Sequence, residues 1–119
     1  MRAAVYARVS TQDQQTLGLQ SEAIATYVKN RGWVATRQIE DVGSGSKERP
    51  GRESLLMAAR RREIDVIVVW RLDRWGRSVA DLMATLHEMT GLGVGFVSLT
   101  EALDLTTPSG RALAGMLAI

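Results

Sequence analysis

Two short segments of this chain, about sixty residues apart, hold side chains that could act together on a phosphate group. In the first segment, YARVST, Arg8 and Ser10 occupy alternate positions and would share one face of a strand. The second segment follows an apolar run and places arginines around one carboxylate: Arg71, Asp73, Arg74 and Arg77. A serine hydroxyl facing several guanidinium groups predicts a nucleophile that attacks a bound phosphate.

The spacing of apolar residues indicates which elements position these segments. Strands are predicted at 3–9, 34–39, 66–70 and 94–99, and helices at 20–31, 52–62, 78–89 and from Pro108 onward. Strands that alternate with helices predict an α/β domain with a mostly parallel sheet flanked by helices. Such open sheets bind ligands at the carboxyl ends of their strands, and both segments follow strand ends. We therefore expect the two segments to meet at one edge of the sheet.

Several local signals support these boundaries. Gly32 is a plausible C-cap of the first helix, and Ser78 with Asp81 three residues later resembles a capping box. The alternating residues of 34–39 are typical of a half-exposed edge strand. The polar, glycine-rich stretch 41–51 predicts a loop.

The last predicted helix has a clear start and no visible end. Thr107 and Pro108 form a good N-cap and first helical residue. The chain then stops on the apolar residue Ile119, without a glycine or a basic last turn. We expect this helix to continue in the natural protein, so that the chain is a truncated fragment.

Composition limits the classes of protein to consider. The chain has 119 residues, 45% hydrophobic and 24% charged, as expected for one globular domain. It has no cysteine, no signal peptide and no apolar run long enough to span a membrane, which favours a cytoplasmic protein. His87 is the only histidine, and we expect it to be a partly exposed packing residue on a helix, so no metal site is predicted.

The net charge of +2 does not by itself indicate a nucleic-acid-binding protein, but thirteen of the fifteen basic residues are arginines. Arginine offers a planar fork to phosphate, although a GC-rich genome explains the same bias. Single residues also have ordinary explanations. Ser10 alone would be a turn residue and Arg8 alone a solvated edge residue, while the later arginines could be surface charges paired with Asp73 and Asp81.

A longer pattern of motifs goes further than composition. The chain contains, in order, YARVST (6–11), Gln20, SGSKERPGR (44–52), LDRWGR (72–77) and a Leu103-Asp104 … Thr107-Pro108-Ser109-Gly110-Arg111 segment. This series resembles the catalytic domain of the serine recombinases, the resolvase/invertase family, over essentially all of residues 1–119. The resemblance implies a resolvase-like α/β catalytic domain.

The resemblance also implies roles for individual residues. Ser10 would be the nucleophile, and Arg8, Arg74 and Arg77 would bind and stabilise the reacting phosphate. Asp73 would transfer a proton or orient a neighbour, and Arg49 matches a further active-site arginine of the family. Gln20 and Tyr6 would contact the substrate.

In this family the serine attacks a DNA phosphodiester, which forms a 5′-phosphoserine ester and a free 3′-hydroxyl. Strand exchange and rejoining then need no metal, ATP or other cofactor. The implied partners are double-stranded DNA, a second subunit in a dimer, and a synaptic tetramer. The family's Glu-Arg pair and its DNA-binding region would lie beyond Ile119, so the fragment alone is expected to be deficient. The proton acceptor stays open between Asp73 and an arginine acting through water.

Two other classes of function compete with this one. A metal-free phosphatase would suit the arginines, but the familiar cysteine nucleophile is impossible here. A non-catalytic module could bind a nucleotide through residues 43–47, GSGSK, although this stretch lacks the Walker spacing.

Overall fold

The computed structural model describes residues 1–9, 14–42, 50–76 and 78–117. Five strands and four α-helices are described, with a 3-10 turn at Leu72–Arg74. In chain order the elements are β1 (Arg2–Val9), α1 (Gln14–Asn30), β2 (Val34–Val42), α2 (Pro50–Arg60), β3 (Val66–Val69), α3 (Val79–Leu92), β4 (Gly95–Ser98), β5 (Leu103–Asp104) and α4 (Pro108–Leu117).

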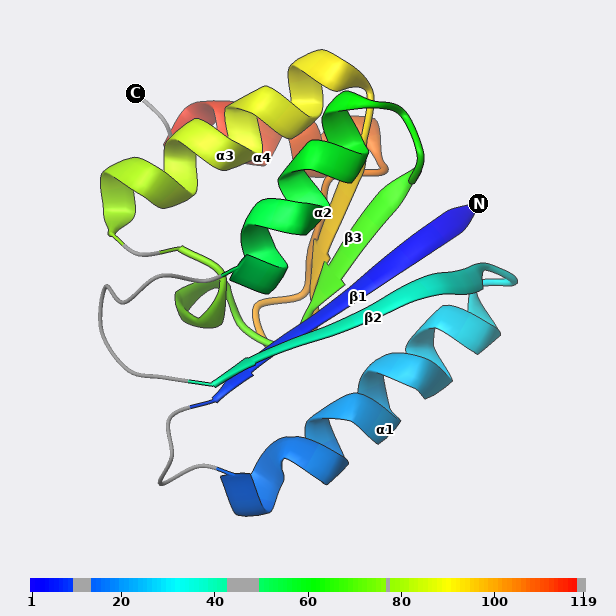
Figure 1. The fold of residues 1–119 in the computed structure, drawn as a ribbon. Coiled ribbons are helices and arrows are strands. Elements are labelled where there is room, and N and C mark those ends of the chain that lie inside the picture. The colour runs from blue at the N-terminus through cyan, green and yellow to red at the C-terminus, as the bar shows by residue number, and fades with distance from the viewer. Residues whose placement is uncertain (10–13, 43–49, 77, 118–119) are drawn as a thin grey trace.

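The strands form one sheet in the order β2-β1-β3-β4-β5, in which only β5 runs antiparallel (Figure 1). Helix α1 covers one face of the sheet, and α2 and α3 cover the other (Figure 1). Because β3 is covered on both faces, all four of its residues are buried and apolar. Two hydrophobic clusters fill the two layers between the sheet and the helices.

The predicted α/β class, the mostly parallel sheet and the order of the predicted elements are confirmed. Gly32 adopts a left-handed conformation at the end of α1, with φ of 74°, as a C-cap requires. Ser78 caps α3, and its hydroxyl accepts the amide of Asp81 at 3.1 Å. The edge position of β2 is also as predicted.

Several predicted boundaries are wrong. Asp41 does not begin a loop; it continues β2 opposite Arg8 and is buried. Helix α2 begins at Pro50, two residues early, because proline suits a first helical position that needs no amide donor. Helix α1 begins at Gln14 instead of residue 20. Strand β5 is missing from the predicted strands because its two residues are too few to show a pattern.

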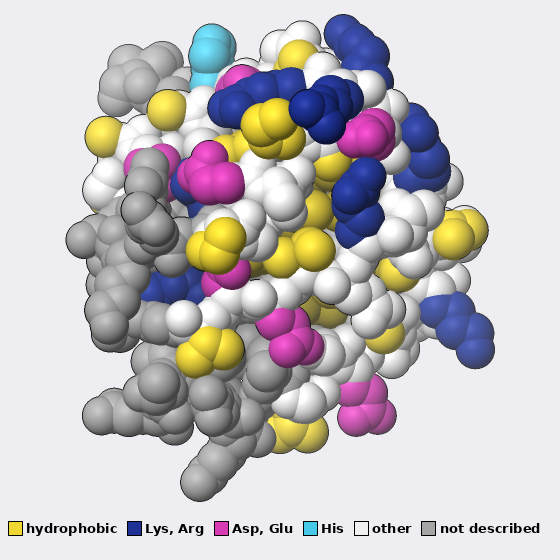
Figure 2. Space-filling model, in the orientation of Figure 1, with side chains coloured by type: hydrophobic (Ala, Val, Ile, Leu, Met, Phe, Trp, Pro, Cys, Tyr) yellow, Lys and Arg dark blue, Asp and Glu magenta, His cyan; other side chains and the backbone are white. Residues whose placement is uncertain are grey.

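No helix in the described part of the chain is both long and apolar enough to cross a membrane. Figure 2 shows acidic side chains among the basic ones on the face that carries α2. The charges on this face are therefore mixed, and any concentrated positive site has to come from local placement of arginines.

Candidate active site

The sheet brings the two predicted segments to one place. Strands β1 and β3 are parallel neighbours and stay paired up to Tyr6 and Val69. Arg8 and Arg71 each follow two residues later, at the same edge of the sheet. The chain passes from β1 to β2 on one side and later to β3 on the other, so this edge is a topological switch point. Open α/β sheets bind ligands in the crevice at such points.

A buried aromatic contact joins the two segments directly. The ring of Tyr6, from YARVST, lies edge to face with the ring of Trp75, from LDRWGR, with centroids 5.3 Å apart. Trp75 also packs against Phe96, and its indole N–H donates to the Thr85 hydroxyl at 2.9 Å. Both rings of the first pair are fully buried. The 3-10 turn Leu72–Arg74, which precedes Trp75, thereby lies in contact with β1.

Arg8 is buried at this strand end, with 5% of its surface exposed. The alternative that Arg8 is a solvated edge residue is therefore wrong. Arg74 closes the 3-10 turn Leu72–Arg74 and is half-buried. Arginine is seldom buried unless its charge is engaged, and the end of β1 and the 3-10 turn place these two arginines at one edge of the sheet.

The Asp73 side chain is more exposed to solvent than those of Arg71 and Arg74. Its carboxylate accepts a 2.8 Å hydrogen bond from Arg71, and both side chains are about half exposed. This pairing agrees with the interpretation that Asp73 orients an arginine, and it leaves the carboxylate accessible. Both residues line an open groove of about 480 Å³ together with Leu72, Gly76, Ser78, Val79, Leu82 and Glu101.

Glu101 supports the 3-10 turn from across this groove. The amide of Leu72 donates to its two carboxylate oxygens at 3.3 Å, and the hydroxyls of Ser98 and Thr100 also donate to it. Burial raises the pKa of Glu101, but these hydrogen bonds outweigh burial and leave its pKa below the ordinary value. Sequence reasoning missed this residue, since a glutamate after a strand end is usually solvated.

Asp41 holds the start of α2 by accepting backbone amides, as Glu101 does for the 3-10 turn. Its buried carboxylate accepts the Tyr6 hydroxyl at 2.7 Å and the amides of Gly51 and Arg52 at 3.0 Å each. A carboxylate at a helix N-terminus satisfies free amides and meets the positive end of the helix dipole. Tyr6 is thus fully enclosed, which favours a supporting role over the predicted contact with substrate.

The remaining predicted residues divide into two groups. Gln20 is buried on α1, the helix that covers the other face of the sheet from α2 and α3. Ser10, Arg49 and Arg77 lie outside the described residues, as does the nucleotide-binding alternative at 43–47. The chain nevertheless continues from described neighbours, so Ser10 follows β1 and Arg49 directly precedes α2.

Other polar groups lie away from this edge. His87 and the basic run at 60–62 are exposed, and Arg60 pairs with Glu88 at 2.9 Å. Hydrogen bonding to Arg60 lowers the pKa of Glu88. Within the described ranges, no three His, Asp or Glu side chains gather as metal ligands would.

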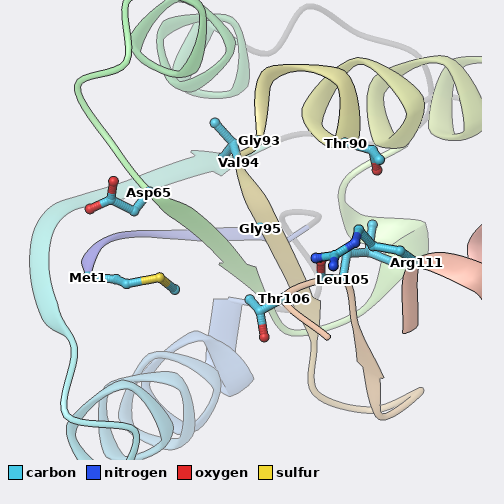
Figure 3. Close-up of a pocket in the computed structure, with 9 residues that line it drawn as sticks. All are labelled: Met1, Asp65, Thr90, Gly93, Val94, Gly95, Leu105, Thr106 and Arg111. Atoms are coloured by element: carbon cyan, nitrogen blue, oxygen red, sulfur yellow. The ribbon is translucent and has the colours of Figure 1, made fainter. Parts of the chain in front are cut away.

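A second hollow, of about 240 Å³, lies at the opposite end of the sheet (Figure 3). Met1, Asp65 and Gly95 line it, and they mark the amino ends of the parallel strands. Asp65 is already paired with Arg2 at 3.1 Å, and this hydrogen bond lowers the pKa of Asp65. The hollow does not belong to the arginine site.

The sequence matches a known family and several curated proteins. Residues 3–119 match the family model described as the resolvase N-terminal domain. A DNA-invertase of Escherichia phage P1 is 41% identical over 107 residues, which are 89% of this chain and 53% of that protein. The Transposon Tn552 resolvase of Staphylococcus aureus is 40% identical over 111 residues, 91% of this chain and 52% of that protein. The chain thus spans about half the length of these curated relatives.

Solved structures agree with the sequence match. The N-terminal catalytic domain of TP901-1 integrase superposes with a TM-score of 0.88 at 26% identity, covering 99% of this chain and 92% of that one. A resolvase family site-specific recombinase from Streptococcus pneumoniae, at 20% identity and a TM-score of 0.79, shares the fold. Since the family model matches nearly every residue, this chain belongs to the resolvase family of serine recombinases.

Proposed function

We propose that this chain is the catalytic domain of a site-specific DNA recombinase and that Ser10 is its nucleophile. The observation that carries the proposal is the buried contact of Tyr6 with Trp75, because it joins the strand that leads to Ser10 to the turn that holds Arg74. Membership of the resolvase family supports the same activity. The named invertase, resolvase and integrase relatives make double-stranded DNA the expected substrate.

The proposed reaction is a transesterification at one DNA phosphodiester. The Ser10 oxygen bonds to phosphorus while the bond from phosphorus to the 3′ oxygen breaks. The serine proton passes to an acceptor, and the leaving oxygen takes up a proton to become a 3′-hydroxyl. The 5′-phosphoserine ester conserves the bond, so a 3′-hydroxyl can later reverse the step and rejoin strands without ATP.

Arginines supply the charge that this transition state requires. Arg8 and Arg74 are held at the crevice by burial and by the aromatic contact, so they need little reorganisation to meet the developing negative charge. Charge-assisted hydrogen bonds contribute roughly 1.5–3 kcal/mol each, so a few give several powers of ten in rate. Arg49 and Arg77 are proposed to add to them. Asp73 is accessible and serves as the proton acceptor or as the group that orients Arg71.

The proposed partners follow from the substrate and the family. We expect the protein to bind double-stranded DNA, to act as a dimer on one site and to form a tetramer when two sites come together. We also expect it to act in the cytoplasm, where its substrate is available.

The decisive experiment is detection of the covalent intermediate. The protein at its natural length should form a DNA adduct that survives denaturation, and peptide mapping should find the phosphate on Ser10. Ser10→Ala should abolish the adduct while changing DNA affinity less than about twofold. Ser54→Ala, at an exposed hydroxyl on α2 that bonds to the Gly51 carbonyl, is the matched control and should retain the adduct. An adduct that persists in Ser10→Ala would assign the nucleophile to another residue.

A further inference from the structure

Arg52 is a buried charged residue outside the set that the motifs predict for the site. It is the third residue of α2 and is 1% exposed. Its Nη2 donates to Asp81 at 2.6 Å, and its Nη1 donates to Glu53 at 3.2 Å. Its guanidinium carbon lies 5.1 Å from the centroid of the Trp75 ring, within the range of a cation–π interaction.

These contacts join three separate parts of the site. Asp81 lies in the first turn of α3, Trp75 follows Arg74 in the LDRWGR segment, and the amide of Arg52 donates to Asp41 at the end of β2. Arg52 is therefore held at its backbone by one strand end and at its guanidinium by the next helix. It links the start of α2 to the start of α3.

Stability alone is a poor explanation for this arrangement. Taking a guanidinium and a carboxylate out of water costs several kcal/mol, and well-packed apolar residues of similar volume are often as stable or more so. The Asp81 side chain is only 18% exposed, so the pair is largely desolvated. The Arg52 Nε is also buried without a hydrogen-bond partner among the described residues. What the pair does provide is a fixed direction, since a planar fork bonds a carboxylate in a defined geometry.

We propose that Arg52 is a positioning residue of the phosphate site: clamped between Asp81 and the Trp75 ring, it fixes the LDRWGR segment relative to the start of α2. Arg74 lies immediately before Trp75, and Arg49 lies three residues before Arg52. The clamp thereby sets the position of the turn that carries Arg74 relative to the start of α2, which follows Arg49 in the sequence. This role rests on the proposed function, because the consequence for catalysis requires that those arginines bind the reacting phosphate.

The test compares Arg52 with a matched salt bridge on the same two helices. Arg60 on α2 pairs with Glu88 on α3 at 2.9 Å, but both side chains are partly exposed and lie far along the helices from the site. Arg52→Met keeps an unbranched apolar stem and removes the guanidinium group, and Arg60→Met makes the same change at the control pair. In the protein at its natural length, Arg52→Met should lower the DNA cleavage rate at least tenfold, since small displacements of catalytic groups cost about a hundredfold. Arg60→Met should leave the rate unchanged.

A second measurement needs no DNA and separates this inference from the proposed function. Trp75 and Gly76 donate their amides to the Leu72 carbonyl, so hydrogen exchange at these amides reports how firmly the segment is held. In residues 1–119, Arg52→Met should speed exchange at these two amides by a larger factor than at the core amides of β3, which report the general loss of stability expected when Asp81 loses its buried partner. Arg60→Met should change neither. Arg52→Lys should restore cleavage only in part, because an ammonium group pairs with Asp81 but lacks the planar fork.

Each outcome of the exchange and cleavage measurements supports or overturns the positioning role of Arg52. Faster exchange with slower cleavage supports it, and a non-additive effect of combining Arg52→Met with Asp81→Asn supports it further. Unchanged exchange and unchanged cleavage in Arg52→Met would overturn it. If Arg52→Met does not fold, Arg52→Lys and Asp81→Asn take its place, and wild-type exchange and cleavage in both would overturn the clamp equally. If no serine adduct forms in the wild type but exchange still responds to Arg52→Met, the proposed function fails and the clamp stands.

Discussion

The Tyr6 hydroxyl donates a 2.7 Å hydrogen bond to Asp41, a residue 35 positions away at the end of the neighbouring strand. The same carboxylate accepts two amides at the start of α2, so one buried group ties β1, β2 and α2 together. The Tyr6 ring also contacts the ring of Trp75. A buried layer of polar and aromatic contacts therefore connects the elements that surround the candidate site.

Loss of the Tyr6 hydroxyl should destabilise the domain. Tyr6→Phe keeps the ring against Trp75 but removes a hydrogen bond to a buried carboxylate, so we expect a loss of about 1.5–3 kcal/mol in the free energy of unfolding. Urea denaturation of residues 1–119 measures it. Tyr27→Phe is the control, because among the described residues the Tyr27 hydroxyl accepts a hydrogen bond from the exposed side chain of Arg31 and from no buried group. Equal effects of the two substitutions would contradict a special role for the Asp41 bond.

Glycine is required at position 51 by close packing. A Cβ there would lie 2.3 Å from Cγ2 of Ile39 and 2.8 Å from Oδ1 of Asp41, so the start of α2 would have to move. Gly51→Ala should therefore lower the unfolding free energy by roughly 1–3 kcal/mol. Gly91→Ala makes the same change in α3, where a Cβ meets nothing within 4 Å, and should be neutral or stabilise by about 0.5–1 kcal/mol. Thermal unfolding of both variants gives the comparison, and a stabilised Gly51→Ala would show that α2 is free to shift.

The placement of Arg8 and Arg74 could be predicted because it depends on local rules. Side chains alternate on a strand, and ligand sites of parallel sheets lie at the carboxyl ends of strands. The burial of Asp41 and Arg52 could not be predicted. Asp41 begins the polar stretch predicted as a loop, Arg52 is the first residue of the predicted helix 52–62, and their partners Tyr6, Trp75 and Asp81 are distant in sequence. Ser10, Arg49 and Arg77 stay predictions.

The contribution of Glu101 should depend on pH in a defined direction. Its folded-state pKa lies below the ordinary value of 4.5, so its carboxylate stabilises the fold above that pH and the effect is lost as pH falls through the folded value. Glu101→Gln should therefore be less stable than the wild type at pH 7, and the difference should shrink below about pH 4.5. Urea denaturation between pH 3 and pH 7 tests this. A difference that is constant over this range would mean that the charge of Glu101 is not what holds the amide of Leu72.

Replacement of Arg74 by lysine separates charge from geometry at the proposed phosphate site. Lysine keeps the positive charge but loses the fork that can meet two phosphate oxygens at once, so cleavage of DNA should fall by about tenfold or more. Arg61→Lys, at an exposed position of the basic run, is the control and should cleave normally. Single-turnover cleavage at saturating protein separates this effect from weaker binding. Wild-type cleavage by Arg74→Lys would show that only the charge matters there, and would remove the bidentate contact from the proposed mechanism.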